Sequence, residues 1–112
     1  MILVEGTSEK FNLGFLNRIP EKYQDNIKKA YYLLKDEGCK SVYLFGSMVT
    51  GNIRDNSDID IGIKGLPEGK FFRAYSTLMF DLGVEFDLVD FDFSKDFFSL
   101  LEDLGEIIEI GW

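Results

Sequence analysis

Acidic and apolar residues alternate along residues 58–63, which read Asp-Ile-Asp-Ile-Gly-Ile. Such alternation is typical of a β-strand, in which successive side chains point to opposite faces of the sheet. The three isoleucines would then face a core, and Asp58 and Asp60 would share the other face, about 7 Å apart by the rise per residue. A chain with this segment must build a sheet that has one apolar face and places two carboxylates together on the other.

Two carboxylates this close repel each other, which raises the pKa of at least one of them unless a cation lies between them. A hard divalent ion, most simply Mg²⁺, is the natural ligand of such a pair. Just upstream, an apolar strand ends at Gly46 and Ser47, where a short helical turn follows. Glycine permits close backbone approach to a ligand, and the unpaired N–H groups of a helix start favour an anion. The sequence therefore predicts a phosphate site beside a metal site.

The rest of the chain predicts a small mixed β-sheet covered by helices, an α/β (α+β) architecture. In residues 1–19, Gly6, Gly14 and Asn17 interrupt any helical pattern. We therefore expect an N-terminal arm with little regular structure before a single domain at 20–112. We expect the abundant aromatic residues to lie in the core. The expected elements besides the strand from residue 58 are a helix from Pro20 to Gly38, a central strand at 41–45, a helix from Phe71 closed by Gly83, a strand at 84–92, a helix capped by Ser94 and stopped at Gly105, and a short edge strand at 106–110.

Composition excludes several classes of function. The 112 residues include 20 acidic and 12 basic ones, a net charge of −8, which disfavours general binding to nucleic acid. Histidine is absent from the sequence, which removes Ser-His and Cys-His nucleophiles and the usual zinc sites. Cys39 is the single cysteine and is expected to pack as a small apolar side chain. Because no segment has the length of a membrane span or the pattern of a leader, we expect a cytoplasmic protein without a membrane segment.

Two motifs together carry a resemblance to a known family. Gly-Ser-x-x-x-Gly at 46–51, followed by Ser-Asp-x-Asp at 57–60, resembles the signature of the polymerase-beta-type nucleotidyltransferase superfamily. Over residues 22–112 the chain resembles the minimal nucleotidyltransferase (MNT) branch of that superfamily. The resemblance implies the nucleotidyltransferase fold, a nucleoside triphosphate as substrate, with ATP favoured, and a site for two Mg²⁺ ions.

The family pattern also includes a third carboxylate, on the strand after the second helix. The residues Phe-Asp-Leu-Val at 86–89 resemble that pattern, so the resemblance assigns the role to Asp87. Asp90 and Asp92 would lie on the opposite face of this strand by the period of two, and Glu85 would only line the cleft.

The resemblance implies a role for each candidate residue. Catalysis and metal binding are expected at Asp58, Asp60 and Asp87, and nucleotide binding at Gly46, Ser47, Ser57 and Arg54. Many relatives carry an arginine just before the second glycine of the first motif, where this chain has Thr50. Arg54 is the favoured replacement, and Lys64, Lys70 and Arg73 are the alternatives.

The acceptor of the nucleotide follows only from the family analogy. MNT proteins of the superfamily often act as antitoxins to a HEPN-type RNase toxin, and some transfer AMP to a tyrosine of that partner. We therefore expect transfer of NMP to a hydroxyl of a partner protein. The alternative is a catalytically silent acidic module that neutralises a basic partner by contact alone. The sequence leaves the oligomeric state open.

Overall fold

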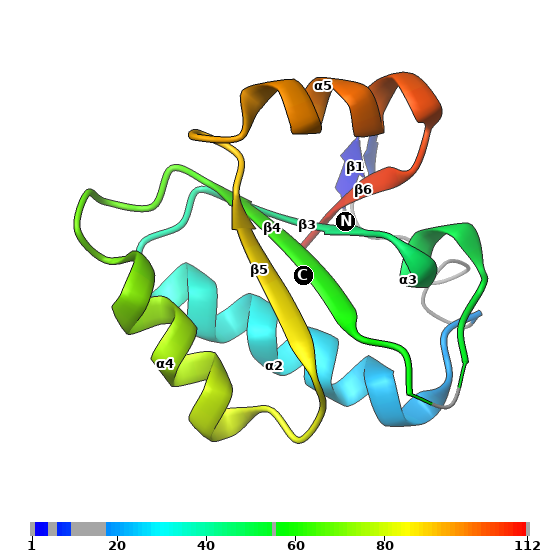
Figure 1. Ribbon diagram of the computed structural model, residues 1–112, viewed down its shortest axis with the longest axis horizontal. Coiled ribbons are helices and arrows are strands. Elements are labelled where there is room, and N and C mark those ends of the chain that lie inside the picture. Colours follow the sequence, from blue (N-terminus) through cyan, green and yellow to red (C-terminus); the bar gives the residue numbers. More distant parts are fainter. Residues whose placement is uncertain (1, 5–6, 10–17, 55, 112) are drawn as a thin grey trace.

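A computed structural model describes residues 2–4, 7–9, 18–54 and 56–111 of the chain. Its main body is a four-stranded sheet with helices on both faces (Figure 1). The elements are β1 (Ile2–Val4), β2 (Thr7–Glu9), α2 (Glu21–Asp36), β3 (Ser41–Phe45), α3 (Ser47–Thr50), β4 (Ile59–Lys64), α4 (Phe71–Asp81), β5 (Phe86–Asp90), α5 (Lys95–Leu104) and β6 (Ile107–Ile110).

The strand order of this sheet is β5-β4-β3-β6. β3 pairs antiparallel with both of its neighbours, whereas β4 and β5 run parallel, as a connection through a helix such as α4 requires. The expected mixed sheet and the α+β class are therefore confirmed. The central place of residues 41–45 and the edge place of the last strand are confirmed as well.

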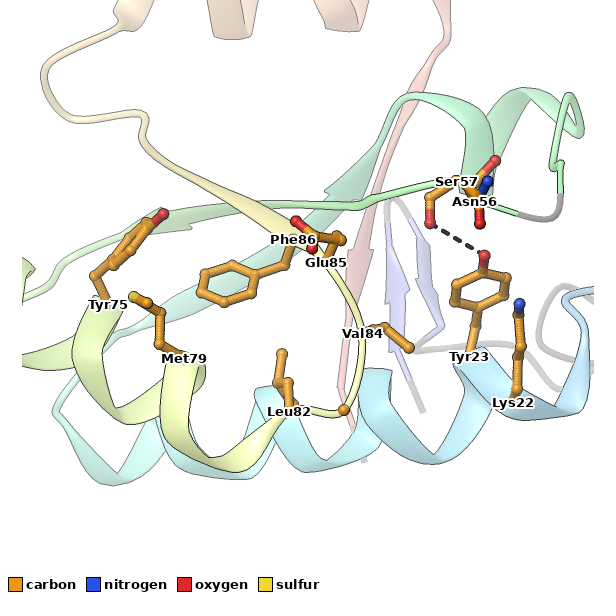
Figure 2. Close-up of a pocket in the computed structure, with 11 residues that line it drawn as sticks. Lys22, Tyr23, Asn56, Ser57, Tyr75, Met79, Leu82, Val84, Glu85 and Phe86 are labelled. Carbon is orange, nitrogen blue, oxygen red and sulfur yellow. Dashed lines mark hydrogen bonds between the residues drawn. The ribbon is translucent and has the colours of Figure 1, made fainter.

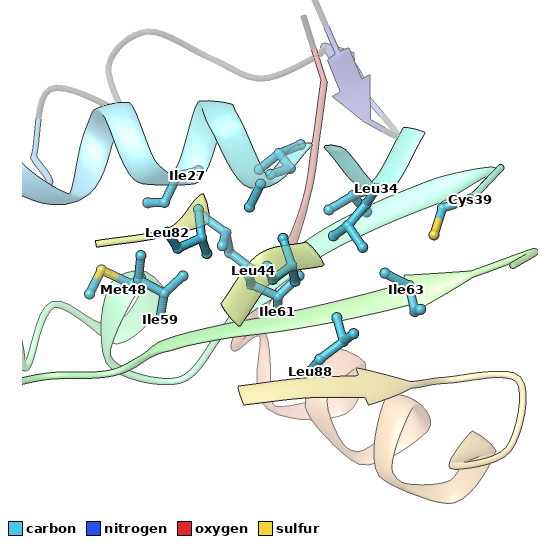
Figure 3. Close-up of a cluster of buried hydrophobic side chains, with 14 of the residues drawn as sticks. Ile27, Leu34, Cys39, Leu44, Met48, Ile59, Ile61, Ile63, Leu82 and Leu88 are labelled. Atoms are coloured by element: carbon cyan, nitrogen blue, oxygen red, sulfur yellow. The ribbon is translucent and has the colours of Figure 1, made fainter. Parts of the chain in front are cut away.

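One face of the sheet is covered by α2 and α4, which lie on the same side in Figure 1. The three isoleucines of β4 point into the core beneath these helices, as the alternation predicts, and each is at most 1% exposed. Figure 3 shows Ile59 and Ile61 of β4 close to Ile27 of α2 and Leu82 after α4. Apolar burial of this extent is the main stabilising contribution to such a fold.

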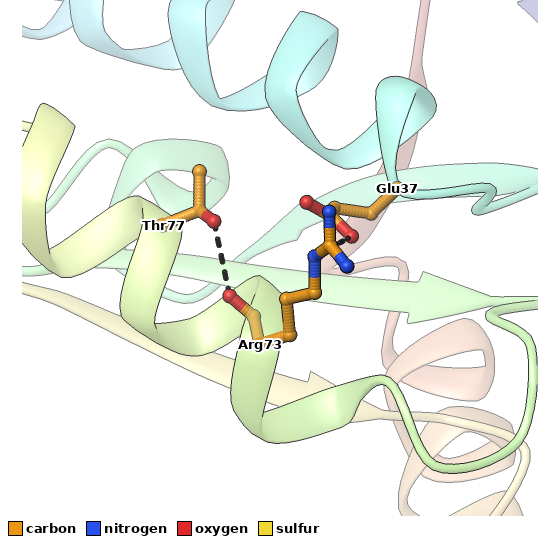
Figure 4. Close-up of polar contacts among 3 residues, drawn as sticks. All are labelled: Glu37, Arg73 and Thr77. Atoms are coloured by element: carbon orange, nitrogen blue, oxygen red, sulfur yellow. Dashed lines mark hydrogen bonds and ion pairs between the residues drawn. The ribbon is translucent and has the colours of Figure 1, made fainter.

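Polar contacts also join α2 to α4. The guanidinium of Arg73 lies 3.2 Å from the Glu37 carboxylate just after α2 (Figure 4). At the other end of the pair, the Lys29 ammonium donates to the carbonyl of Asp81 at 3.1 Å, and the Gly83 N–H donates to Asn26 Oδ1 at 3.1 Å. The two hydrogen bonds are exposed, and in the ion pair the Arg73 side chain is 72% exposed and the Glu37 side chain 13%, so these contacts orient the two helices more than they stabilise them.

On the opposite face of the sheet, the described residues form α5 and a small aromatic cluster. Phe45, Phe91 and Leu101 form its buried centre. Phe91 is fully buried and lies against Gly62, where a Cβ would overlap the Phe91 ring. The glycine in the alternating segment thus makes room for an aromatic side chain on this face.

The sequence predicts the main body more accurately than the N-terminal arm. Instead of an arm without regular structure, β1 and β2 pair as an antiparallel two-stranded sheet. The physical reason is that Ile2-Leu3-Val4 and Thr7 favour extended backbone. The part of the arm at residues 10–17 lies outside the described residues, and the boundary between arm and domain stays a prediction.

The expectation that the aromatic residues lie in the core is wrong for several of them. Only Ala74 and Leu78 of α4 are buried, whereas Phe72 and Phe80 are 81% and 89% exposed. Phe93, in the turn before α5, is 87% exposed. A periodic pattern identifies a helix, but these helices carry more apolar side chains than the faces that touch the sheet can cover.

Two smaller expectations have clear outcomes. Cys39 is buried, as predicted, and burial raises the pKa of its thiol to about 11. Among the described residues, the helices are all too short or too polar to cross a membrane.

Candidate active site

Asp60 and Asp87 face each other across neighbouring strands. The parallel register of β4 and β5 pairs Asp60 directly with Asp87. Residues paired in this way have their side chains on the same face, so the two carboxyl groups lie side by side across the strands. The structure thus brings together two of the three predicted carboxylates, from segments 27 positions apart.

The third carboxylate, Asp58, lies directly before the first residue of β4. Its charge acts on Asp60, whose environment is unfavourable for a negative charge. Burial, followed by the charges of Asp87 and then Asp58, raises the pKa of the Asp60 carboxyl from 3.8 to about 6. Carboxylates that perturb one another in this way are typical of sites built to receive a cation.

The Gly46 corner lies against the same carboxylate. Gly46 has φ +72° and ψ −146°, a conformation that side chains disfavour, and a Cβ on it would overlap Asp60 Oδ2. Glycine at this position therefore allows both the backbone conformation of the turn and the close approach of the Asp60 carboxyl group. It also starts α3, whose first turn is closed by the N–H groups of Val49 and Thr50, each 3.0 Å from the Gly46 carbonyl.

The Met48 side chain anchors α3 to the core, where it is 2% exposed. Val49 packs against the same core. Two of the three positions between the Gly-Ser pair and Gly51 therefore serve packing, and the third is Thr50. The described structure supplies no arginine at these positions.

The loop before Asp58 is held by a residue that the sequence does not single out. The hydroxyl of Tyr23, on α2, donates to the Ser57 carbonyl at 3.0 Å and reaches the Arg54 carbonyl at 3.4 Å. Within the loop, the Arg54 N–H donates to Ser57 Oγ at 2.7 Å. Ser57 therefore shapes the loop in this structure. Tyr23 reads in the sequence as one more core position of α2, because its partners lie more than 30 positions away.

The four candidate cations differ in their surroundings. Arg54 is exposed on the loop beside Asp58, and the contacts described above involve its backbone. The Lys64 ammonium lies 3.5 Å from the centre of the Phe98 ring, at the far end of β4. Arg73 pairs with Glu37 on the other face of the sheet. Arg54 therefore keeps the best position for the predicted role, Lys64 and Arg73 do not share it, and Lys70 is exposed to an intermediate degree next to α4.

The carboxylates that the strand period excludes from the site lie elsewhere. Asp92 accepts a hydrogen bond from the Gly65 N–H at 2.7 Å, and Asp90 accepts one from the Asp92 N–H at 2.9 Å. Asp90 is the last residue of β5 and Asp92 lies in the turn after it, at the end of the strand away from Asp87. Their separation from the candidate site agrees with the prediction.

A pocket of about 540 Å³ opens between the start of α2, α4 and the segment before β5 (Figure 2). Tyr75, Met79 and Phe86 supply apolar walls, and Lys22 and Ser57 supply polar ones. Because Ser57 and Phe86 directly precede Asp58 and Asp87 in sequence, the pocket adjoins the segments that present these carboxylates. Glu85 also lines this pocket, but none of the three predicted carboxylates does, so its place in the carboxylate cleft stays a prediction.

The oxygen donors of this site have the chemistry that Mg²⁺ requires, because carboxylates are its preferred protein ligands. The geometry is only partly assembled. Among the described residues, no three His, Cys, Asp or Glu side chains are arranged to hold a metal ion. Asp60 and Asp87 are paired across the strands, whereas Asp58 lies just before β4.

Comparison with known proteins gives the chain a family. The model of the family described as "Polymerase beta, Nucleotidyltransferase" matches residues 25–101, more than half of the chain. No curated protein matches the chain significantly.

Three solved structures are similar to parts of the chain. A toxin-antitoxin with AMP-PNP is 33% identical, with 61% of this chain and 56% of that chain covered and a TM-score of 0.47. A mutant of the toxin-antitoxin MntA-HpeT is 31% identical, covers 56% and 55%, and has a TM-score of 0.46. A candidate nucleotidyltransferase from Sulfolobus solfataricus is 20% identical, covers 87% and 83%, and has a TM-score of 0.43.

The chain thus spans little more than half the length of the first two of these proteins. The family model, by contrast, runs through both motifs, Asp87 and most of α5. On this ground the chain belongs to the polymerase beta nucleotidyltransferase family.

Proposed function

We propose that this protein is a Mg²⁺-dependent nucleotidyltransferase of the MNT type, which transfers AMP from ATP to a hydroxyl group of a partner protein. The observation that carries the proposal is the pairing of Asp60 with Asp87 across β4 and β5, beside the Gly46 corner. Burial and the neighbouring charges of Asp87 and Asp58 raise the pKa of Asp60, and a carboxylate in such a place is costly to the fold unless it binds a cation. The partner and the MNT branch rest on the resemblance of the sequence motifs.

In this proposal the three carboxylates hold the metal ions, and Gly46 and Ser47 hold the triphosphate through backbone N–H groups. Bound Mg²⁺ would supply the positive charge that the phosphates and carboxylates need to approach one another. The acceptor oxygen attacks the α-phosphorus in line with the leaving group. The new O–P bond forms as the bond to pyrophosphate breaks, and the acceptor proton passes to the Asp87 carboxylate and from there to water.

Asp60 has a further role as the positioning group of the site. It is paired with Asp87 across the strands and lies against Gly46, so it links the metal ligands to the phosphate site. Tyr23 contributes indirectly, since its hydroxyl fixes the loop that presents Asp58 and Arg54. Arg54 is the cation that this proposal assigns to the nucleotide, together with Ser57.

The test is a transfer assay with ATP labelled at the α-phosphate or, in parallel, at the γ-phosphate. Purified protein and Mg²⁺ are incubated with an extract of the host, and the labelled acceptor is identified by mass spectrometry. We expect label from the α position only, and its loss in Asp60→Asn and Asp87→Asn. Asp103→Asn, which changes an exposed carboxylate on α5, is the matched control and keeps full activity.

The alternative is a binding module without turnover, and the missing arginine before Gly51 together with the incompletely assembled metal site favours it. Thermal stability separates the two functions. A functional site binds Mg²⁺ and ATP in the native state, so together they raise the melting temperature of the wild type but not of Asp60→Asn. Absence of both the labelled product and this rise, with any of the four nucleotides, would replace the enzyme by the binding module.

A further inference from the structure

β5 is an edge strand whose free side offers unpaired backbone groups. Within the described residues it pairs with β4 alone. The Glu85 carbonyl accepts from the Ile59 N–H and the Phe91 N–H donates to the Ile63 carbonyl, both across the β4 side. Since consecutive residues of a strand direct their backbone groups to opposite sides, Phe86, Leu88 and Asp90 direct theirs to the free edge.

Part of this edge is already closed by the chain itself. The Asp90 carbonyl accepts hydrogen bonds from the N–H groups of Phe93 at 3.1 Å and Ser94 at 3.0 Å. This leaves the N–H and C=O groups of Phe86 and Leu88 and the Asp90 N–H directed outward. Such a row is a ready template for another strand, and proteins usually protect it with lysine or proline, neither of which occurs in β5.

A hollow of about 480 Å³ lies along this edge, which we call the edge groove. Its lining residues are Phe71, Leu88, Val89, Asp90, Phe93 and Ser94. Leu88 and Val89 point to opposite faces of the sheet, so a hollow lined by both lies beside the strand and not above one face. Phe93 is 87% exposed at one wall and Phe71 stands at the other, on α4. The edge groove therefore combines free backbone groups with an apolar seat for a side chain.

The charges near the edge groove indicate the kind of segment that fits it. Asp87, Asp90 and Asp92 lie on β5 and the turn after it, whereas the nearest cations in sequence are Arg73, which pairs with Glu37, and Lys95. A second copy would bring another β5 with the same carboxylates, and each copy carries a net charge of −8. Like charges close together on paired strands are destabilising, so a basic segment fits better than a copy.

We propose that the free edge of β5 binds an extended segment of a partner protein, in which basic and apolar residues alternate, as a fifth strand of the sheet. One apolar side chain of the segment would occupy the edge groove between Phe71 and Phe93. The backbone groups of Phe86 and Leu88 would supply the affinity common to all such segments, and the groove and the carboxylates would supply selectivity.

This inference deepens the proposed function and rests on it in one respect. Neighbouring strands lie about 5 Å apart, so the residue of the added strand that pairs with Asp87 would stand on the same face as its carboxylate. The added strand would therefore present a serine, threonine or tyrosine hydroxyl directly to the proposed base. Binding itself needs neither metal nor nucleotide.

The test begins with a phage-displayed library of random twelve-residue peptides, selected on the wild-type protein. The enriched peptides are synthesised and their affinities measured by fluorescence anisotropy, without Mg²⁺ or ATP. We expect alternation of apolar residues with lysine or arginine, and a loss of at least tenfold in affinity for Phe93→Ser. Phe80→Ser is the matched control, since Phe80 is 89% exposed on α4 and does not line the groove, and it should bind as the wild type does.

Backbone pairing is tested separately. A peptide with N-methyl groups on one set of alternate residues cannot donate to β5, whereas methylation of the other set leaves the pairing side intact, so only one of the two peptides should bind. Hydrogen exchange of the Phe86 and Leu88 amides should slow on binding. Enriched peptides that bind Phe93→Ser as well as the wild type, peptides that bind as helices, or the absence of any enriched peptide would each overturn the proposal.

Two results separate this inference from the proposed function. If selected peptides bind the wild type and Asp60→Asn equally but no nucleotide is ever transferred, the proposal of strand docking is supported and the proposed enzyme activity is refuted. If transfer to the natural acceptor proceeds unchanged in Phe93→Ser, the edge groove is not the docking site. A dimer in sedimentation velocity that Phe93→Ser abolishes would give the edge to a second copy and overturn the choice of occupant.

Discussion

The two faces of the four-stranded sheet differ in what the same strand contributes to them. On the face under α2 and α4, β4 presents three isoleucines to a core with 17 buried residues. On the face under α5, the same strand presents Asp60 and Gly62, and the aromatic cluster there has three buried members among the described residues, Phe45, Phe91 and Leu101. Alternation along one strand thus places its core side chains on one face and its candidate site residue, Asp60, on the other.

This difference explains why the carboxylates can lie so close together. The repulsion of Asp60, Asp87 and Asp58 is a local cost, and apolar burial on the other face offsets it. Active sites commonly contain such unfavourable arrangements, which the rest of the fold maintains. Substitutions on the two faces should therefore differ in the quantity that they change.

The largest expected effect is on the covered face. Ile61→Ala should lower the free energy of unfolding by about 3–4 kcal/mol, because it removes three buried carbons and leaves a cavity in the core. Urea denaturation followed by circular dichroism measures the loss. Ile107→Ala, in the partly buried rim of the cluster on the other face, should cost about 1 kcal/mol. Equal losses at both positions would contradict the difference between the faces.

The second effect tests the aromatic cluster of the open face. Gly62→Ala should destabilise the protein by about 2–3 kcal/mol, because its Cβ would overlap the Phe91 ring. Replacing the Phe91 ring by the smaller leucine side chain should relieve the overlap. In a double-mutant cycle with Phe91→Leu, the two losses should therefore be less than additive by at least about 1 kcal/mol. Strict additivity would mean that the two residues do not interact.

The third prediction concerns pH. The pKa of the Asp60 carboxyl is about 6 in the folded protein, against an ordinary value of 3.8, which we take for the unfolded chain. The folded protein therefore binds the proton of this carboxyl more tightly than the unfolded chain does. The stabilisation by this protonated carboxyl is complete below about pH 4 and is lost as the pH rises through 6. Allowing for partial exposure, the metal-free protein should lose about 1–2 kcal/mol of stability over this window.

Asp60→Asn removes this titration. At pH 8 without metal, the variant should be more stable than the wild type by about 1–2 kcal/mol, and its stability should not fall between pH 4 and 6. Chemical denaturation at a series of pH values measures both. Glu109→Gln, on β6, is the control and should keep the slope of the wild type. If Asp60→Asn is less stable than the wild type at pH 8 without metal, the ionised Asp60 carboxylate does not destabilise the folded protein, and this prediction is wrong.

The fourth prediction concerns the hydrogen bond that links the covered face to the active loop. Tyr23→Phe removes the hydroxyl that donates to the Ser57 carbonyl, with an expected cost of about 1 kcal/mol. The rate of nucleotidyl transfer should fall by more than any loss of folded protein explains, since the loop carries Asp58. Tyr75→Phe, which changes a ring of the same pocket, is the control. Unchanged transfer in Tyr23→Phe would remove the tyrosine from the positioning of the loop.

The smallest expected effect is at the surface of the covered face. Arg73→Gln breaks the ion pair with Glu37, but Arg73 is 72% exposed, so the cost should be about 0–0.5 kcal/mol. The loss should vanish at 1 M NaCl, where the charges are screened. Differential scanning calorimetry at low and high salt resolves it. A loss above 1 kcal/mol at both salt concentrations would show that the pair contributes more than orientation.

Much of this molecule follows from local pattern. The alternation at 58–63 identifies β4 and its two faces, and the spacing of Tyr23, Ile27, Ala30 and Leu34 identifies α2 and its buried side. Gly105 ends α5 with a φ of +69°, as expected of a glycine after a helix. These features depend on residues close together in the chain, so the sequence alone determines them.

Other features depend on which segments meet, and only the tertiary structure decides them. The pairing of Asp60 with Asp87 needs the register of two parallel strands, and the bond from Tyr23 to the loop joins residues 34 positions apart. The exposure of Phe72, Phe80 and Phe93 was missed for the same reason, because hydrophobicity does not show which apolar side chains find a covering surface. A sequence thus determines which face a side chain takes, while the contacts of that face depend on packing between distant segments.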